Sequence, residues 1–397
     1  MGNPLQTLLD LSEQERVDRG LQHTPREIWQ QPETWRTTYD ICSSRRSQLM
    51  DALRRAGIGR GSTASPTVYL AGAGTSDYIG RALAPLLRQR WGCDVWAVPS
   101  TTLLTDFDEY HTAGKQYLWI SFSRSGDSPE SVAVLERALE RNRDIHHLVP
   151  TCNAQGAMAQ LCAKYPERAF ALVLNDAVND RGLAMTSSFS NMLLAGQCVA
   201  HLDDLEEFGD VVGRLSDCGR QFLPLASEVA AEVTTLGCKR ACFVGAGVLR
   251  GVADECALKL VELSAGNVTT LAETSLGLRH GPMSSVDGQT LFVALLSSES
   301  RRRGYELDLL REIDRKRLGR VKLAVTAGDG SDVTELADYR LPIGSGLDFP
   351  DCYRPVLDVM LGQLLGLFAS MRCGLKPDHP SPTGAISRVV QPIKLYS

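Results

Sequence analysis

Residues 68–87 read VYLAGAGTSDYIGRALAPLL, and residues 241–260 read ACFVGAGVLRGVADECALKL. Both stretches run from an apolar strand through Gly-Ala-Gly into a pattern typical of a helix. They are 173 positions apart, and the same offset relates LWISFSRS, which begins at Leu118, to LFVALLSS, which begins at Leu291. HLVPTCN and KLAVTAG match at almost the same shift. Repetition at one offset indicates that the chain contains one structural unit twice.

Each half alternates short apolar strands with amphipathic helices such as PESVAVLERALERN and GYELDLLREIDRKRLG. This alternation is typical of a parallel sheet covered by helices on both faces. The sequence therefore predicts an α/β protein with two tandem domains, each a flavodoxin-like three-layer α/β/α sandwich. We expect the phosphate-binding domain at 45–205 and the catalytic domain at 217–370, separated by an acidic helical stretch. A helical arm at 1–44 and a proline-rich tail at 371–397 complete the organisation.

The arm contains HTPREIWQQPETW, which predicts a helix start with Thr24 as N-cap, Pro25 at the first helical position and Glu27 three residues after the cap.

The composition excludes several classes of protein. Of the 397 residues, 43% are hydrophobic and 22% are charged, no apolar run is as long as a membrane span, and no secretion signal opens the chain. We therefore expect a cytoplasmic protein without a membrane segment. A net charge of −5 gives no field that attracts nucleic acid. The eleven cysteines lack metal-ligand spacing, so they are expected as reduced core residues, with no metal bound.

A serine-rich loop, SFSRSGDSPES at 121–131, follows the apolar segment QYLWI. Ser123, Ser125 and Ser128 place hydroxyl groups beside backbone amides before a helix, a combination suited to a phosphate monoester. The alternative is a capping turn with Ser128 as N-cap and Pro129 at the first helical position. This stretch alone does not choose between the two interpretations.

Two further hydroxyl pairs favour the phosphate interpretation. Thr75 and Ser76 follow the first strand, and Thr186 and Ser187 stand at another helix start, so three loops could meet around one anion. A dinucleotide fingerprint is incomplete because its third glycine would fall at Asp77. We therefore expect no nicotinamide cofactor.

The second half has Leu296 where the first half has Ser123, so we expect it not to bind phosphate. Its segment ECALKLVE places Glu255, Lys259 and Glu262 on one face of a helix. Glu262 could be a general base in partly apolar surroundings. The alternative, which the spacing by itself favours, is a solvated charged stripe.

LRHGP adds a histidine, His280, which can exchange protons near neutral pH. The alternative is a polar loop residue on the surface. His379 in DHPSP is a weaker candidate of the same kind.

Together, SRSGDSPES, ALKLVELSAG and LRHGP resemble the sugar isomerase (SIS) family, whose members carry tandem SIS domains and act on phosphosugars. The resemblance spans about residues 45–390, and this part of the chain is similar to the isomerase half of glucosamine-6-phosphate synthase. It implies a phosphate loop made of Ser123, Arg124, Ser125 and Ser128 with Ser76.

The same resemblance implies catalytic roles without any cofactor. Glu262 would move the proton between C1 and C2, and His280 would open the sugar ring. Lys259 or nearby amides would stabilise the charge that develops on oxygen. In the synthase, the corresponding histidine enters the active site of the other subunit, which implies a homodimer or higher homo-oligomer with shared sites. The alternative is a site closed within one chain.

The chain also departs from the synthase. It begins Met1-Gly2 without a cysteine nucleophile, so ammonia transfer from glutamine is not expected, and Ser387 or Arg388 stands near the place of the synthase's C-terminal lysine. EIWQQPETW, DRGLAMTSS, SFSRSGDSPESV, TCNAQGA and PTGAISRVVQ resemble the galactosamine-6-phosphate deaminase/isomerase subgroup, long described as tagatose-6-phosphate ketose/aldose isomerases.

This resemblance implies conversion of galactosamine 6-phosphate to tagatose 6-phosphate and ammonia. Isomerisation without deamination, or glucosamine 6-phosphate as the substrate, are alternatives within the class. A non-catalytic sugar-phosphate sensor is the alternative from another class, and the presence of Glu262 and His280 argues against it.

Overall fold

The computed structural model describes residues 3–59, 65–344, 349–391 and 393–396. The chain forms two compact units, each built around one β-sheet. The first-sheet unit comprises Glu33–Asp180, Ser187–Gly213 and Ile386–Ser397, and the second-sheet unit comprises Met1–Pro32, Arg181–Thr186 and Arg214–Ala385.

The first sheet is parallel and has the strand order β2-β1-β3-β4-β5. Its strands are β1 (Thr67–Gly72), β2 (Val95–Pro99), β3 (Tyr117–Ser121), β4 (Ile145–Thr151) and β5 (Ala169–Val173). Helices cover both faces. One face carries α6 (Thr75–Trp91) and α11 (Ser187–Ala200), and the other carries α7 (Ser100–Thr105), α8 (Phe107–Tyr110), α9 (Pro129–Arg141) and α10 (Ala157–Lys164).

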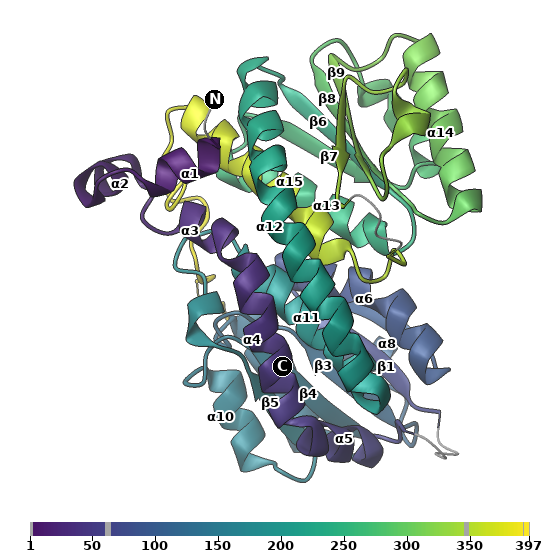
Figure 1. Cartoon of the computed structure of the whole chain (residues 1–397). Helices are drawn as coiled ribbons and strands as arrows, with labels where there is room; N and C mark the ends of the chain where they lie inside the picture. The colour runs from purple at the N-terminus through teal and green to yellow at the C-terminus, as the bar shows by residue number, and fades with distance from the viewer. Residues whose placement is uncertain (1–2, 60–64, 345–348, 392, 397) are drawn as a thin grey trace. The chain divides into compact units, whose positions relative to one another are not determined.

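The second sheet is also parallel, with the order β10-β9-β8-β6-β7. Its strands are β6 (Arg240–Gly245), β7 (Thr269–Glu273), β8 (Thr290–Leu296), β9 (Val321–Thr326) and β10 (Tyr339–Pro342). Helices α13 (Val248–Leu263) and α15 (Pro355–Arg372) lie on one face, and α14 (Ser300–Arg315) lies on the other (Figure 1).

The remaining helices connect or flank these layers. They are α1 (Pro4–Leu9), α2 (Glu13–Arg19), α3 (Thr24–Trp29), α4 (Gln31–Ser44), α5 (Arg46–Arg55) and α12 (Leu205–Thr235), with the 3-10 turns η1 (Asp176–Val178), η2 (Leu202–Asp204), η3 (Gly277–Arg279), η4 (Pro282–Ser285) and η5 (Ser331–Val333).

The predicted repeat and the predicted fold class are both confirmed. Read from β7, the second sheet has the same order as the first, and β6 begins and ends 173 positions after β1. The turns that follow these strands are also alike. Gly74 and Gly247 have φ/ψ of 55/−124° and 57/−126°, a conformation that favours glycine. Both units are therefore three-layer α/β/α sandwiches of the same topology.

A second glycine in each turn allows helix and strand to approach closely. A Cβ atom added to Gly72 would lie 2.4 Å from the carbonyl carbon of Ser76, and one added to Gly245 would lie 2.5 Å from the carbonyl oxygen of Leu249. Neither distance leaves room for a side chain. The Gly-Ala-Gly signature thus brings the first turn of α6, and of α13, against the end of the preceding strand.

The predicted capping role of Thr24 is wrong by one residue. Helix α3 begins at Thr24, so its N-cap is His23, which makes no side-chain capping hydrogen bond. Instead, the buried carboxylate of Asp378 accepts hydrogen bonds from the Thr24 amide at 2.8 Å and the Thr24 hydroxyl at 2.7 Å. Glu27 accepts a hydrogen bond from the Arg181 amide at 2.5 Å. A carboxylate distant in sequence has taken over the capping function.

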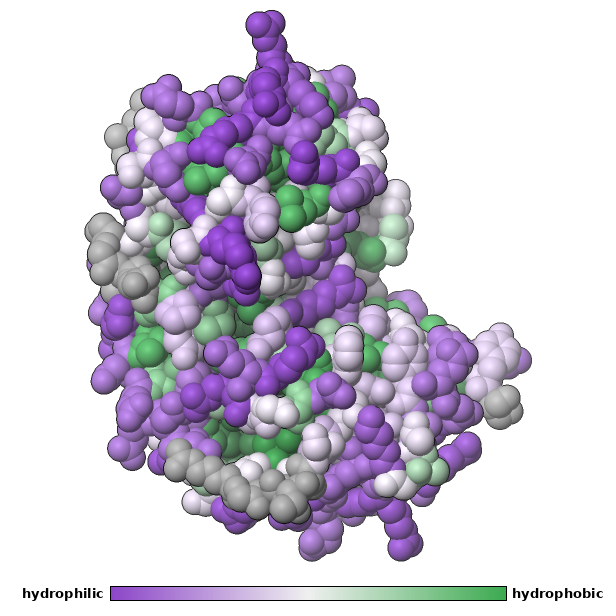
Figure 2. All heavy atoms as spheres, turned by 90° about the vertical axis from the view of Figure 1, so that its right-hand side faces the viewer, coloured by the Kyte–Doolittle hydropathy of each residue, from purple (hydrophilic) through white to green (hydrophobic). Residues whose placement is uncertain are grey.

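Each sheet lies within one of the expected domain ranges, 45–205 and 217–370, while the bounds of these domains, of the arm and of the tail stay a prediction. No helix in the described part of the chain is long and apolar enough to cross a bilayer. Hydrophilic side chains cover most of the face drawn in Figure 2, and hydrophobic ones form smaller patches between them.

Candidate active site

The first sheet has a topological switch point between β1 and β3, where the chain leaves toward β2 on one side and toward β4 on the other. Crevices at such points, outside the carboxyl ends of the strands, are the usual ligand sites of open parallel sheets. Ser76 lies in the first turn of α6, directly after β1, and the serine-rich loop follows β3. The topology therefore brings these two predicted loops to the same edge of the sheet.

The serine hydroxyls of the loop are placed as donors. The Ser123 Oγ accepts the Gly126 amide at 3.0 Å, and the Ser125 Oγ accepts the Asp127 amide at 3.2 Å. Each hydroxyl keeps its own proton for a further partner. Ser128 is the N-cap of α9, as the alternative interpretation required, but its side chain makes no capping hydrogen bond. The helix start therefore does not account for the hydroxyl groups.

The loop after β4 holds the serine loop in place. The Asn153 Nδ2 donates to the Ser125 carbonyl at 2.8 Å, and the Ala157 amide donates to the Asp127 carboxylate at 2.9 Å. A Cβ atom on Gly156 would lie 2.5 Å from the Ser125 carbonyl oxygen, so only glycine fits there. The segment TCNAQGA contributes to the family resemblance, but nothing in the sequence indicates that Asn153 holds the serine loop in place.

Arg124 is mostly buried and contacts the C-terminal tail of the same unit. Its Nη2 donates to the Arg388 carbonyl at 2.6 Å, and the Arg388 guanidinium donates to the Asp180 carbonyl and to the Asn179 side chain, both at 2.8 Å. Arg388 therefore lies beside the serine loop. The sequence did not show where this part of the tail lies.

Thr186 and Ser187 are fully buried at the start of α11. The Ser187 amide donates to the Asp180 carboxylate at 3.1 Å. Ser76, Ser123 and Ser125 are buried as well, but each retains some exposed surface, between 4 and 8%. The assignment of Thr186 and Ser187 as substrate ligands stays a prediction, and their full burial does not favour it.

The second-sheet unit holds the predicted acid–base residues on α13. Lys259 is fully buried, and its Nζ lies 2.5 Å from the Glu262 Oε2 and 3.5 Å from the Glu255 Oε1. Glu255 is fully buried, whereas the Glu262 side chain is 19% exposed. The three residues are therefore not a solvated stripe, because only Glu262 reaches the surface.

A buried ammonium group between two carboxylates has a clear electrostatic function. Lys259 neutralises charge that would otherwise be costly to bury, and it donates to the carboxylate that faces outward. Glu262 is thereby oriented by a charge-assisted hydrogen bond, and its side chain remains partly exposed. The function of Glu262 as a general base stays a prediction, and a carboxylate held in one orientation is compatible with it.

His280 is exposed and follows the 3-10 turn η3. Its amide donates to the Gly277 carbonyl at 3.0 Å, and Gly281 has φ +122°, which favours glycine. No hydrogen bond to its ring is present among the described residues. The backbone therefore fixes where the loop turns and leaves the imidazole accessible. The serine loop and the Lys259–Glu262 pair belong to different compact units.

Among the residues that the structure describes, no group of three or more histidine, cysteine, aspartate or glutamate side chains is placed to hold a metal ion. The groups that are present can bind an anion through hydroxyls and can accept and return a proton through a carboxylate.

Comparison with known sequences identifies close relatives. The chain is 38% identical to an AgaS protein from Streptomyces coelicolor, over 96% of this chain and 97% of the relative. It is 34% identical to the D-galactosamine-6-phosphate deaminase AgaS of Escherichia coli, over 94% of this chain and 95% of the relative. No protein-family model matches the chain.

Solved structures share the fold. A protein from Clostridium novyi NT superposes with a TM-score of 0.92 at 33% identity and covers 98% of both chains. The tagatose-6-phosphate ketose/aldose isomerase of Escherichia coli gives a TM-score of 0.83 at 32% identity, over 92% of this chain and 96% of that one. The predicted family resemblance and the tandem SIS fold are therefore confirmed.

Proposed function

This chain belongs to the AgaS family of D-galactosamine-6-phosphate deaminases, and from that premise we propose that it converts D-galactosamine 6-phosphate to D-tagatose 6-phosphate and ammonia. The observation that supports this most is the outward-facing Glu262 carboxylate, held at 2.5 Å by the buried Lys259 ammonium. A protein that only senses a sugar phosphate needs no such base.

The serine loop binds the phosphate group. Ser123 and Ser125 each have a hydroxyl proton to donate, and Ser128 and Ser76 stand beside the amino ends of α9 and α6. Helix amino ends favour anions because their free amides and dipoles point outward. Arg124 adds positive charge to the loop, and its hydrogen bond to the tail orients it.

The reaction itself needs one proton transfer and one hydrolysis. His280 assists opening of the pyranose ring. Glu262 then takes the proton from C2 and returns one to C1, so the aldehyde becomes a primary alcohol and the amine becomes a ketimine. Water adds to C2 of the ketimine, and ammonia leaves to give the ketose. Lys259 is fully buried, so it acts on this transfer through Glu262, whose carboxylate it orients and whose charge it balances.

We further propose a cytoplasmic homodimer in which His280 serves the partner's site. The ring of His280 is exposed on a turn fixed by Gly281, which suits a residue that reaches outward. Thr186 and Ser187 either support the start of α11 or contact the substrate. Their replacement by alanine should lower the stability of the protein in the first case and weaken substrate binding in the second.

A second candidate is ketose/aldose isomerisation without loss of ammonia, which the similarity to the tagatose-6-phosphate isomerase of Escherichia coli favours. The two reactions share the Glu262 step and differ in whether C2 carries an amine.

Incubation of the purified protein with galactosamine 6-phosphate, glucosamine 6-phosphate and tagatose 6-phosphate, each separately, tests the proposal. Ammonia and ketose are expected in equal amounts from the galactosamine compound. Isomerisation of tagatose 6-phosphate without ammonia from either amino sugar would select the second candidate. No product from any of the three sugars would contradict both.

A further inference from the structure

The second sheet has its own switch point, between β6 and β8, and hydroxyls are present there. Leu296 replaces the hydroxyl of Ser123, as the sequence shows, but Ser298 stands 173 positions after Ser125 and Ser297 adds another hydroxyl. This edge of the second sheet therefore offers amides and hydroxyls of the kind that bind phosphate in the first.

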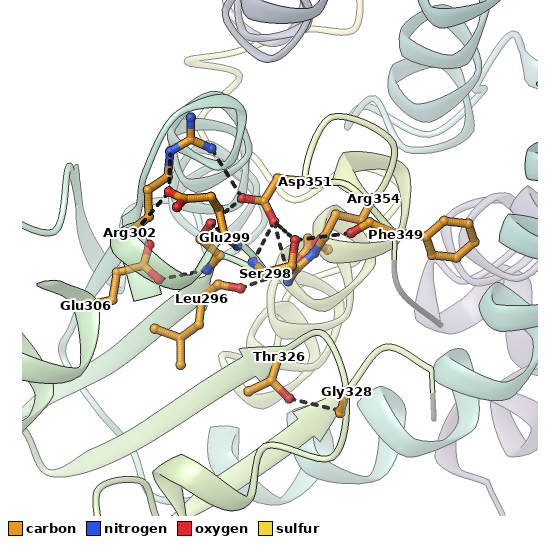
Figure 3. Close-up of polar contacts among 12 residues, drawn as sticks. Leu296, Ser298, Glu299, Arg302, Glu306, Thr326, Gly328, Phe349, Asp351 and Arg354 are labelled. Carbon is orange, nitrogen blue, oxygen red and sulfur yellow. Dashed lines mark hydrogen bonds and ion pairs between the residues drawn. The ribbon is translucent and has the colours of Figure 1, made fainter. Parts of the chain in front are cut away.

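A carboxylate from the same chain occupies these donors. Asp351 accepts from the Ser298 amide and from the Ser298 hydroxyl, both at 2.8 Å, and from the Ser297 hydroxyl. Figure 3 shows the Asp351 carboxylate directed at Ser298, with Arg302 on its other side. Asp351 is 6% exposed, so its charge is removed from solvent and depends on these partners.

Two arginines also lie beside this carboxylate, while the Ser297 amide donates to a second carboxylate, Glu306, at 2.7 Å. The Nη1 atoms of Arg302 and Arg354 each lie 3.6 Å from an Asp351 oxygen. The Arg302 guanidinium also lies beside Gly247, at the amino end of α13, where a Cβ atom would be 3.5 Å from it. Hydroxyls, a backbone amide and guanidinium groups around one anion are the donor set of a phosphate site.

The first sheet differs at the matching place. In the described part of the chain, no carboxylate binds the Ser123 or Ser125 hydroxyl, and both accept only backbone amides of their own loop. The two repeats thus share the loop, and they differ in whether an internal anion fills it.

We propose that the second repeat retains an anion-binding site for a phosphate group and that Asp351 fills this site as a permanent internal substitute. The chain therefore binds one phosphosugar rather than two. The site also anchors α15, because Asp351 precedes this helix and Arg354 at its start donates to the Leu296 carbonyl at 2.7 Å.

The anchoring matters for the acid–base residues, since α15 packs closely on α13. A Cβ atom on Gly366 would lie 2.8 Å from the Lys259 carbonyl oxygen, so the two backbones are nearly in contact. A displaced α15 would disturb the helix that carries Lys259 and Glu262. The internal carboxylate converts a ligand site into a support for the catalytic helix.

The test removes the internal anion and supplies inorganic phosphate. Asp351→Ala is compared with Asp351→Asn, which keeps the side-chain volume, in a Ser123→Ala/Ser125→Ala background that weakens the first site. Thermal unfolding is measured in sodium phosphate and in sodium chloride of equal ionic strength. Phosphate should raise the melting temperature of the Asp351→Ala protein by a few degrees, increasing with the logarithm of its concentration. The Asp351→Asn protein should show no such rise.

Equal responses of the two folded variants to phosphate would overturn the proposal. If Asp351→Ala folds only in phosphate, the proposal is supported directly. If it folds in neither salt, Asp351→Asn in the native background decides. Its stability at pH 7 must fall below that of the parent, because the neutral amide leaves the hydroxyl donors and the Arg302 guanidinium without their anion. A variant as stable as the parent contradicts the proposal. Because the readout is phosphate binding rather than turnover, failure here is distinct from failure of the proposed activity.

Discussion

The Nζ atom of Lys259 lies 2.5 Å from the Glu262 Oε2, and the lysine is fully buried whereas the glutamate reaches the surface. An ion pair with one buried and one accessible partner holds the accessible carboxylate in a single orientation. Catalysis by proton transfer needs this orientation, because the base must meet the C2 proton at hydrogen-bond distance.

Glu262→Gln should abolish proton transfer while leaving the sugar phosphate bound. The amide has nearly the same shape but cannot take a proton, so kcat should fall by at least about 10²-fold with little change in substrate affinity. Exchange of solvent deuterium into C2, followed by NMR, should disappear with turnover. Glu335→Gln, an exposed carboxylate of the same unit, is the matched control. Exchange at the parent rate in Glu262→Gln would identify another residue as the base.

Ser125→Ala, alone or with Ser123→Ala, should weaken substrate binding more than turnover. Contacts to the phosphate exist in both the ground state and the transition state, so their loss raises KM, by about tenfold for one hydrogen bond to a charged group. Steady-state kinetics measures the two constants separately. Ser43→Ala, an exposed serine of the same unit, should change neither. A variant that loses kcat with an unchanged KM argues against the phosphate loop.

Mixing two inactive variants tests the shared site. If Glu262 of one subunit works with His280 of its partner, a heterodimer of Glu262→Gln and His280→Ala has one intact site and one site with both defects. Random equal exchange of subunits should restore up to about a quarter of the parent activity. Activity is measured after subunit exchange has been demonstrated by native mass spectrometry. No recovery after such exchange means that each site is built within one chain.

Burial of His147 makes the first-sheet unit sensitive to acid. The ring is fully buried, neither nitrogen has a hydrogen-bond partner among the described residues, and burial lowers its pKa from 6.5 to about 3. The unfolded chain therefore binds this proton first, and stability falls as the pH drops below about 6.5. Between pH 7 and pH 5 this residue alone accounts for a loss of about 2 kcal/mol.

His147→Leu removes the titrating group and should flatten this part of the pH dependence of the free energy of unfolding. Urea denaturation at a series of pH values measures it. His379→Gln, at an exposed histidine, should leave the parent's dependence in place. The same steepness in His147→Leu as in the parent would show that other groups cause the acid sensitivity.

The two-sheet fold could be predicted from the amino-acid sequence, because its signals lie within short segments. The Gly-Ala-Gly turns depend on φ values that favour glycine at Gly74 and Gly247, and the alternation of strands and helices follows from hydrophobic periodicity. The positions of the serine loop and of the Glu262 helix can be predicted for the same reason. Each is one continuous segment, and the residues that give it its chemical character are neighbours in the sequence.

Contacts between groups that are far apart in the chain could not be predicted in this way and are seen only in the folded protein. Asn153 donates a hydrogen bond to the Ser125 carbonyl, and Asp378 caps a helix more than 350 residues earlier in the chain. Asp351 fills the anion site of the second sheet, although strands β9 and β10 separate it in the chain from Ser298. Hydrogen bonds of this kind depend on how strands order themselves in the sheets and on which helices pack together. In the sequence, Asp351 and Asp378 look like any surface aspartate. Their functions arise because folding removes their carboxylates from water and gives them specific hydrogen-bond donors.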